Sequence, residues 1–347
     1  MKTIGSFLLM TIVTALVLFL LPLLGKRMLS PSVIFHPLRS IVVSSVNREP
    51  NNKNLSCAAD ASDDAQIIYW KMRFPRTLFA ILAGAGLSLA GMVFQAVFRN
   101  PLATPFTLGV SSGAAFGATF YFLLPIKFAF LGLAGTTWFA FGGALLAVFI
   151  VHILSWKRNM SSEEMLLAGV AVSLFFSSLI LLMQYIAEQY QVFVMIRWVM
   201  GGLADTSAWH IIFIAPLVFV GTALLLIYSR ELNILTTGSE RAMTLGVDVA
   251  RVRLITFYLV SFLVGGIVSI CGPIGFVGLI IPHICRRIVG SDHRRLAPAS
   301  ALFGGVFLAL CDAAARSVMA PIEIPVGVVT SLLGGPFFLG LLLRKRA

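Results

Sequence analysis

Residues 77–98 read TLFAILAGAGLSLAGMVFQAVF and contain no Asp, Glu, Lys or Arg. A helix needs about 20 consecutive apolar residues to cross the hydrocarbon core of a bilayer, so this segment is long enough to span it. Other runs without these charged residues lie at 3–25, 100–126, 128–156, 165–187, 206–229, 254–285 and 324–343. The chain is therefore predicted to be an all-α polytopic membrane protein.

The composition supports the same prediction. Of 347 residues, 59% are hydrophobic and 12% are charged, whereas a soluble domain carries roughly 25% charged residues. The first run resembles a signal peptide in its apolar character. However, it has no small-residue cleavage site and ends at Lys26 and Arg27, so we predict a retained helix.

Two stretches each contain a pair of predicted helices. Residues 254–285 are too long for one helix at about 1.5 Å per residue and are interrupted by Cys271-Gly272-Pro273. Residues 295–344 are divided by a charged interval at 312–323. A single membrane domain, 1–347, is therefore predicted to have ten spans, at about 4–24, 75–98, 105–124, 134–155, 164–186, 209–229, 254–271, 274–289, 297–315 and 325–343.

The positive charges indicate the orientation. Lys and Arg of cytoplasmic loops usually outnumber those outside, and here most fall in the short loops on the side of both termini. The short loops of the other side carry only Lys127, Arg197 and Arg316. Both termini are thus predicted to be cytoplasmic, with a long first outer loop at 26–72. The net charge of +12 then reflects membrane orientation, so no nucleic-acid partner is predicted.

The sequence lacks the residue patterns of nucleotide binding, metal binding and ion coupling. The only Gly-Lys pair, Gly25-Lys26, has no glycine five positions earlier, so no phosphate-binding loop is predicted. The cysteines at 57, 271, 285 and 311 have no metal-ligand spacing. Charged residues are almost missing from the predicted spans; Asp312 and Arg316 are spaced for an i,i+4 pair near an outer helix end. No enzyme activity and no bound cofactor or metal are predicted, and the energy for any pumping must come from a partner.

The predicted cytoplasmic loop 230–253 reads RELNILTTGSERAMTLGVDVARVR. Residues 239–245 favour a short helix, Gly246 favours its end, and residues 247–252 can form a second one. Two short helices on the cytoplasmic face would offer a rigid surface to a soluble subunit. A solvated basic loop is the alternative, and the residues alone leave both open.

This loop and three further segments resemble one known family. Residues 238–247 (GSERAMTLGV), 73–114, 272–305 and 310–346 are similar, in the same order, to the FecCD family of permeases of type II ABC importers, which carry iron-siderophores, haem or cobalamin. The resemblance implies ten spans in a bacterial inner membrane and a dimer with an identical or paralogous permease. It also implies two cytoplasmic ATPases, which use ATP and Mg²⁺, and an external substrate-binding protein.

The resemblance also implies site residues. The ATPase-coupling positions are Gly238, Glu240, Ala242, Leu245, Gly246 and Val247. The positions implied to dock the binding protein are Arg73, Arg76 and Arg316, since arginine binds carboxylates bidentately; anchoring to phospholipid is the alternative. The implied cytoplasmic gate region is Ser161, Ser162 and Glu163, although acidic groups also simply favour a helix N-terminus.

A second function class fits a polytopic chain: an ATP-independent secondary transporter or channel for a small polar solute. Such proteins usually keep ionisable residues in the membrane for ion coupling, and the predicted spans hold almost none. The sequence therefore favours the ABC importer permease.

Overall fold

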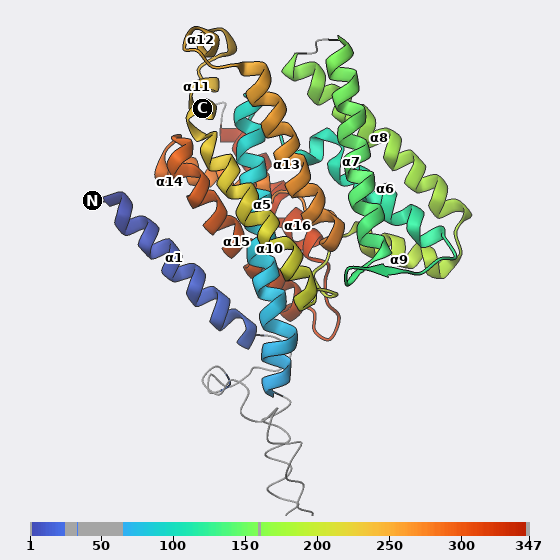
Figure 1. Ribbon diagram of the computed structural model, residues 1–347. Helices are drawn as coiled ribbons and strands as arrows, with labels where there is room; N and C mark the ends of the chain where they lie inside the picture. Colours follow the sequence, from blue (N-terminus) through green and yellow to red (C-terminus); the bar gives the residue numbers. More distant parts are fainter. Residues whose placement is uncertain (1, 25–32, 34–64, 159–160, 345–347) are drawn as a thin grey trace, which may run out of the picture.

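The computed structural model describes residues 2–24, 33, 65–158 and 161–344, which fold into a bundle of helices (Figure 1). The predicted first outer loop, including Cys57, lies mostly outside the described residues. The α-helices are α1 (Lys2–Leu20), α5 (Phe74–Val97), α6 (Val110–Leu123), α7 (Gly135–Arg158), α8 (Ser162–Ile186), α9 (Gln189–Val199), α10 (Ala208–Ile227), α11 (Ser229–Leu235), α12 (Ser239–Thr244), α13 (Val249–Cys271), α14 (Val277–Val289), α15 (His293–Ser317) and α16 (Val326–Arg344).

Short elements complete the described chain. They are the 3-10 helices η1 (Leu21–Leu23) and η3 (Pro105–Leu108), the π-helix η2 (Ile68–Arg73), and an antiparallel hairpin of β1 (Ala129–Phe130) and β2 (Leu133–Ala134).

The prediction of an all-α membrane protein is confirmed, whereas the count of ten spans is not. Each of the ten predicted ranges falls on a helix. Six helical segments are long and apolar enough to cross a membrane: Ala65–Val97, Gly135–Ser155, Ser162–Ile186, Ala208–Ile227, Val249–Cys271 and His293–Ser317. Shorter apolar helices occupy Met10–Leu23, Val110–Leu123 and Val326–Leu341. Ten spans therefore stays a prediction.

Two helical segments were not predicted. The helix expected from residue 75 begins at Ala65, because Tyr69 is fully buried and its hydroxyl donates a hydrogen bond to the carbonyl of Phe19 at 2.9 Å. Residues 65–72 are thus helical and do not belong to the loop. The second segment, α9, begins with a reciprocal cap in which Glu188 and Gln191 each bind the other's backbone.

Helix α5 lies at the centre of the bundle. Its most apolar window is 83% buried, and it packs against α10, α13, α14 and α15. Close approach depends on glycines: a Cβ on Gly84 would overlap the main-chain oxygen of Gly304, and a Cβ on Gly91 would overlap that of Gly278. Small residues allow this packing in membranes, where lipid removes the hydrophobic force between helices.

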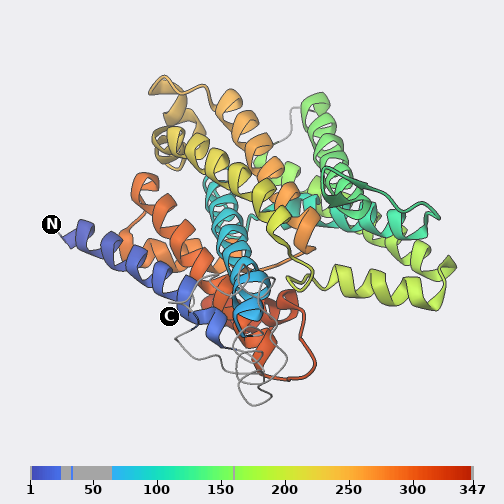
Figure 2. The same ribbon diagram turned by 60° about the horizontal axis from the view of Figure 1, so that its bottom comes forward.

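The bundle has two ends (Figures 1 and 2). The α12 end carries α11 and α12, and α16 ends on this side of the bundle. The Arg76 end carries the start of α5, the end of α15 and the connection 318–325 to α16. The functional positions predicted from the sequence divide between these two ends.

Candidate ion-pair network and coupling surface

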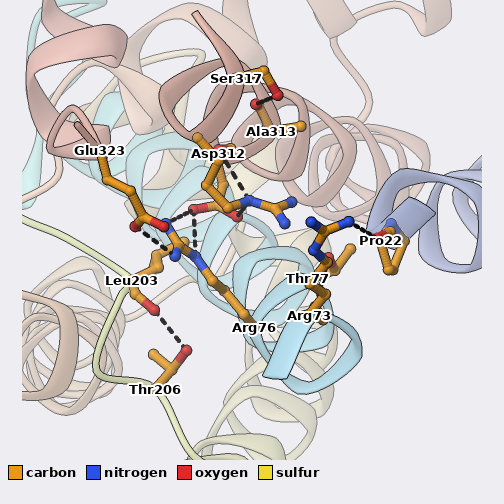
Figure 3. Close-up of polar contacts among 11 residues, drawn as sticks. Pro22, Arg73, Arg76, Thr77, Leu203, Thr206, Asp312, Ala313, Ser317 and Glu323 are labelled. Atoms are coloured by element: carbon orange, nitrogen blue, oxygen red, sulfur yellow. Dashed lines mark hydrogen bonds and ion pairs between the residues drawn. The ribbon is translucent and has the colours of Figure 1, made fainter. Parts of the chain in front are cut away.

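At the Arg76 end, one arginine joins three elements. The first turns of α5 direct Arg76 toward α15, where its Nη2 lies 2.8 Å and its Nε 2.9 Å from Oδ1 of Asp312 (Figure 3). Its Nη1 lies 2.8 Å from Oε2 of Glu323 in the connection between α15 and α16. The side chains of Arg76 and Asp312 are 10% and 1% exposed, so two oppositely charged groups are withdrawn from water together.

Arg316 shares the same carboxylate. Its Nε lies 3.1 Å from Oδ2 of Asp312, which confirms the i,i+4 pair predicted from the sequence. Its Nη1 and Nη2 are buried and make no hydrogen bond to any residue that the structure describes. Two buried arginines therefore share one buried carboxylate, each on a different oxygen.

Arg73 is the last residue of η2, directly before α5, and its guanidinium points toward Pro22 of η1 (Figure 3). The side chain is half-buried, and its Nη1 donates to the carbonyl oxygens of Pro22 and Leu23 at 3.1 and 3.4 Å. The structure thus ties α5 to the end of α1 through this residue.

The three arginines predicted to dock the binding protein differ in exposure. Arg76 and Arg316 are 8% and 7% exposed, because Asp312 draws both guanidinium groups into the bundle. The sequence indicated the Asp312–Arg316 pair by helical spacing. Nothing in the sequence indicated that Arg76 contacts Asp312, because the two residues are 236 positions apart in the chain.

At the α12 end, the predicted coupling residues form one short surface. Gly238 precedes α12 with φ +126°, a conformation that side chains disfavour. Ala242 is fully buried and accepts the main-chain N–H of half-buried Val247 at 3.0 Å. Leu245 is 65% exposed, and the remaining two, Glu240 and Gly246, are also exposed.

The two short helices predicted in this loop are placed differently. The pair consists of α11 and α12, whereas residues 249–252 form the first turn of the long helix α13. The reason is local: the Asp248 carboxylate accepts the main-chain N–H of Arg251 at 3.0 Å and caps α13. The prediction of a separate second helix at 247–252 is wrong.

Hydrogen bonds connect α11, next to this surface, with the start of α15. The Asn233 side chain donates to Asp292 at 2.7 Å and accepts the main-chain N–H of His293 at 2.8 Å. The hydrogen bond from Asn233, helped by the main-chain N–H of Arg294, lowers the pKa of the Asp292 carboxyl below its ordinary value. Helix α11 is thereby fixed to the start of α15.

The predicted gate residues lie at the start of α8. The Ser161 hydroxyl accepts the main-chain N–H of Glu164 at 3.2 Å, while Glu164 accepts that of Ser161 at 2.6 Å. This reciprocal cap accounts for Ser161, and Ser162 and Glu163 stand in the first turn. A gate role stays a prediction.

No group of three or more His, Cys, Asp or Glu that could hold a metal ion occurs in the described part of the chain. Cys271, Cys285 and Cys311 are buried as free thiols. Neither end of the bundle therefore offers a metal centre among these residues.

Comparison with known proteins gives the arrangement a context. The cobalamin import system permease of Halobacterium salinarum is 42% identical over 81% of this chain and 74% of that protein. The molybdate import system permease of Haemophilus influenzae is 41% identical over 81% of this chain and 82% of that protein.

A solved structure has the same fold. It is an inward-facing conformation of an ABC transporter assigned to the metal-chelate type, with a TM-score of 0.81, 31% identity, and coverage of 98% of this chain and 99% of that one. The model of the FecCD transport family matches residues 7–344. The chain therefore belongs to the FecCD transport family and is a membrane-spanning permease subunit of an ABC importer.

Proposed function

We propose that this permease imports a metal chelate of the cobalamin, haem or ferric siderophore class across a bacterial inner membrane. The substrate is received from an external binding protein at the Arg76 end, and two cytoplasmic ATPases act on the α12 end. The proposal includes ten spans, cytoplasmic termini and a second permease, identical or paralogous. Helix α8 offers a surface for that second copy, since only 22% of its most apolar window is buried in this chain.

The observation that carries the proposal is an exposed apolar surface on a fixed backbone. Met243 and Leu245 are 58% and 65% exposed, yet Ala242 beneath them is fully buried. Because Ala242 is buried, a movement of a docked ATPase would displace α12 together with the helices that it contacts, as a rigid body. Apolar side chains held outward at a loop are typical of a docking site.

The ATPase contact can be tested by co-purification of the permease with its ATPase. Leu245→Asp places a charge in the apolar contact, and we expect ATPase recovery to fall about ten-fold or more, since burying an unpaired charge in an interface costs several kcal/mol. Ile322→Asp is the matched control, because Ile322 is 68% exposed at the other end. Equal ATPase recovery with both variants would contradict the proposal.

For the binding protein, we propose different tasks for the three arginines. Arg76 braces α5 against α15. Arg316 has two buried Nη groups without a hydrogen-bond partner among the described residues, so a local rearrangement would have to expose them to the binding protein. Arg73 is half-buried nearby. We propose that Arg73 and Arg316 meet carboxylates of the binding protein. Charge reversal at Arg73 is expected to weaken that complex without preventing membrane insertion.

The substrate class is tested by uptake into vesicles that contain the permease, its ATPase and its binding protein. Cobalamin, haem, a ferric hydroxamate and molybdate form the panel, the last because a molybdate permease is among the similar proteins. We expect ATP-dependent uptake of one of the three chelates. Uptake of molybdate alone would overturn the substrate class, and uptake without ATP would favour a secondary transporter.

A further inference from the structure

A cleft and a groove adjoin each other near the Arg76 end. The cleft has a volume of about 360 Å³ and is bordered by charged and polar side chains, among them Arg197, Asp205 and His210. The groove has a volume of about 220 Å³ and is almost entirely apolar. Thr137, Ser269 and Ile270 border both. One continuous surface therefore passes from polar to apolar.

The groove runs between three membrane helices. Its walls are Trp138 and Phe141 of α7, Phe213 and Leu217 of α10, and Phe262 and Gly266 of α13. Phe141 and Phe262 meet edge to face with ring centroids 5.1 Å apart. Gly266 and Leu217 lie close together in this wall, since a Cβ on Gly266 would overlap the Leu217 side chain. An extended hydrocarbon chain is the ligand that such a surface accommodates.

Aromatic side chains locate the polar edge of the membrane beside it. The Trp138 indole donates to the carbonyl of Phe130 in the hairpin at 3.2 Å, and Trp209, 59% exposed, lies against Gly132. Trp is enriched where hydrocarbon meets lipid headgroups. The groove then lies at the depth of acyl chains and the cleft at the depth of headgroups.

The cleft carries both signs of charge in accessible positions. Arg197 and Asp205 are exposed. The ion pairs among the described residues all involve Arg76 or Asp312, so neither Arg197 nor Asp205 forms an ion pair with another described residue. The Nδ1 of His210 accepts the main-chain N–H of Ser207 at 3.0 Å, so a neutral ring carries its proton on Nε2 and can donate it. A ligand with a phosphate and an ammonium group matches this set.

We propose that one phosphatidylethanolamine molecule binds here, with its phosphate on Arg197 and His210, its ammonium on Asp205, and an acyl chain in the groove. Phosphatidylcholine lacks N–H donors for Asp205, and phosphatidylglycerol carries no cation. The shape selects a lipid, and the paired charges select its headgroup.

The test is a binding titration of the delipidated chain in detergent, followed by native mass spectrometry with each of the three lipids. We expect one phosphatidylethanolamine to bind about ten-fold or more tightly than either of the others, the effect of one charge-assisted hydrogen bond. Arg197→Gln should weaken phosphatidylethanolamine binding about ten-fold. Asp205→Asn should remove the preference over phosphatidylcholine.

The groove for the acyl chain is tested separately. Gly266→Leu fills the groove and should weaken all three lipids, whereas Gly142→Leu, where a Cβ meets nothing within 4 Å, should change none. Equal affinity of the unaltered chain for the three lipids would overturn the proposal, as would unchanged binding to both headgroup variants. Arg197 and Asp205 are exposed, so those variants are expected to fold, and the assay needs neither ATPase nor binding protein.

Discussion

At the scale of single residues, Asp312 has the largest predicted effect. It is 1% exposed and is the shared partner of Arg76 and Arg316. Asp312→Asn keeps the shape but leaves two arginines at a buried site without that carboxylate. Removing one partner of a buried ion pair costs about 3–5 kcal/mol, and we expect a clearly lower thermal midpoint in detergent. In a Cys57→Ser background a thiol-reactive dye can report it, because Cys271, Cys285 and Cys311 are buried until the chain unfolds.

Two further variants separate the buried charge from a general defect. Glu323→Gln changes a side chain that is 47% exposed, so its cost should stay near or below about 1 kcal/mol. Adding Arg316→Gln to Asp312→Asn removes one uncompensated cation and should restore part of the lost stability. A double variant that is as unstable as the sum of both single variants would contradict a shared carboxylate.

The network also shows how far residue-level prediction reached. Asp312 and Arg316 are one helical turn apart, so their pairing follows from sequence spacing. The contact of Arg76 with Asp312 depends on how α5 and α15 pack, which spacing along the chain does not encode. For the same reason the burial of Arg76 could not be predicted from the sequence.

At the scale of helices, the close approach of α5 and α14 gives a second prediction. Gly91→Ala would drive a Cβ into the main-chain oxygen of Gly278, and backbone cannot yield as a flexible side chain does. We expect a cost of about 1–3 kcal/mol and a lower midpoint in the thiol-dye assay. Gly142→Ala is the matched control, since nothing lies within 4 Å of its added Cβ; it should be neutral or stabilise by up to about 1 kcal/mol. Equal midpoints for both variants would show that α5 and α14 can separate without cost.

The link between α11 and α15 predicts a dependence on pH. The folded pKa of Asp292 is depressed by the hydrogen bond from Asn233, so its stabilising effect is complete above the unfolded pKa, about 3.8, and is lost as pH falls through the folded value. The carboxyl is exposed, so the effect is small, about 0.5 kcal/mol. Wild type should be slightly more stable than Asp292→Asn at about pH 6, and the difference should shrink progressively as pH falls below the unfolded pKa of about 3.8. A difference that does not change with pH would contradict this assignment.

Helix positions were largely predictable, because long apolar runs and their breaks mark the spans. The exceptions depend on contacts that are distant in the chain. Residues 65–72 contain charged Lys71 beside Tyr69, and their helix forms against α1 through Tyr69. Helix α9 carries a local signal in Glu188 and Gln191, the reciprocal cap, but it is too short to be recognised as a span.

At the scale of the whole molecule, α5 connects the two functional ends. From Arg76 to Val97 it rises about 30 Å at 1.5 Å per residue, similar to the hydrocarbon core of a bilayer. Just beyond, a Cβ on Gly238 would lie 3.8 Å from the Arg99 guanidinium. One buried helix therefore begins at the ion-pair network and ends beside α12, so a tilt of α5 would move both ends together.

This arrangement requires the two ends to lie on opposite sides of the membrane, which site-directed labelling can test. Ile322→Cys and Met243→Cys, each made with Cys57→Ser, place thiols at positions 68% and 58% exposed. The native Cys271, Cys285 and Cys311 are buried and should stay unlabelled. With a membrane-impermeant maleimide, we expect Ile322→Cys to react in intact cells and Met243→Cys to react only after permeabilisation. The permease should be expressed without its partners, which would cover both positions. Labelling of both thiols from one side would contradict the separation of docking and coupling, and the reverse pattern would contradict cytoplasmic termini.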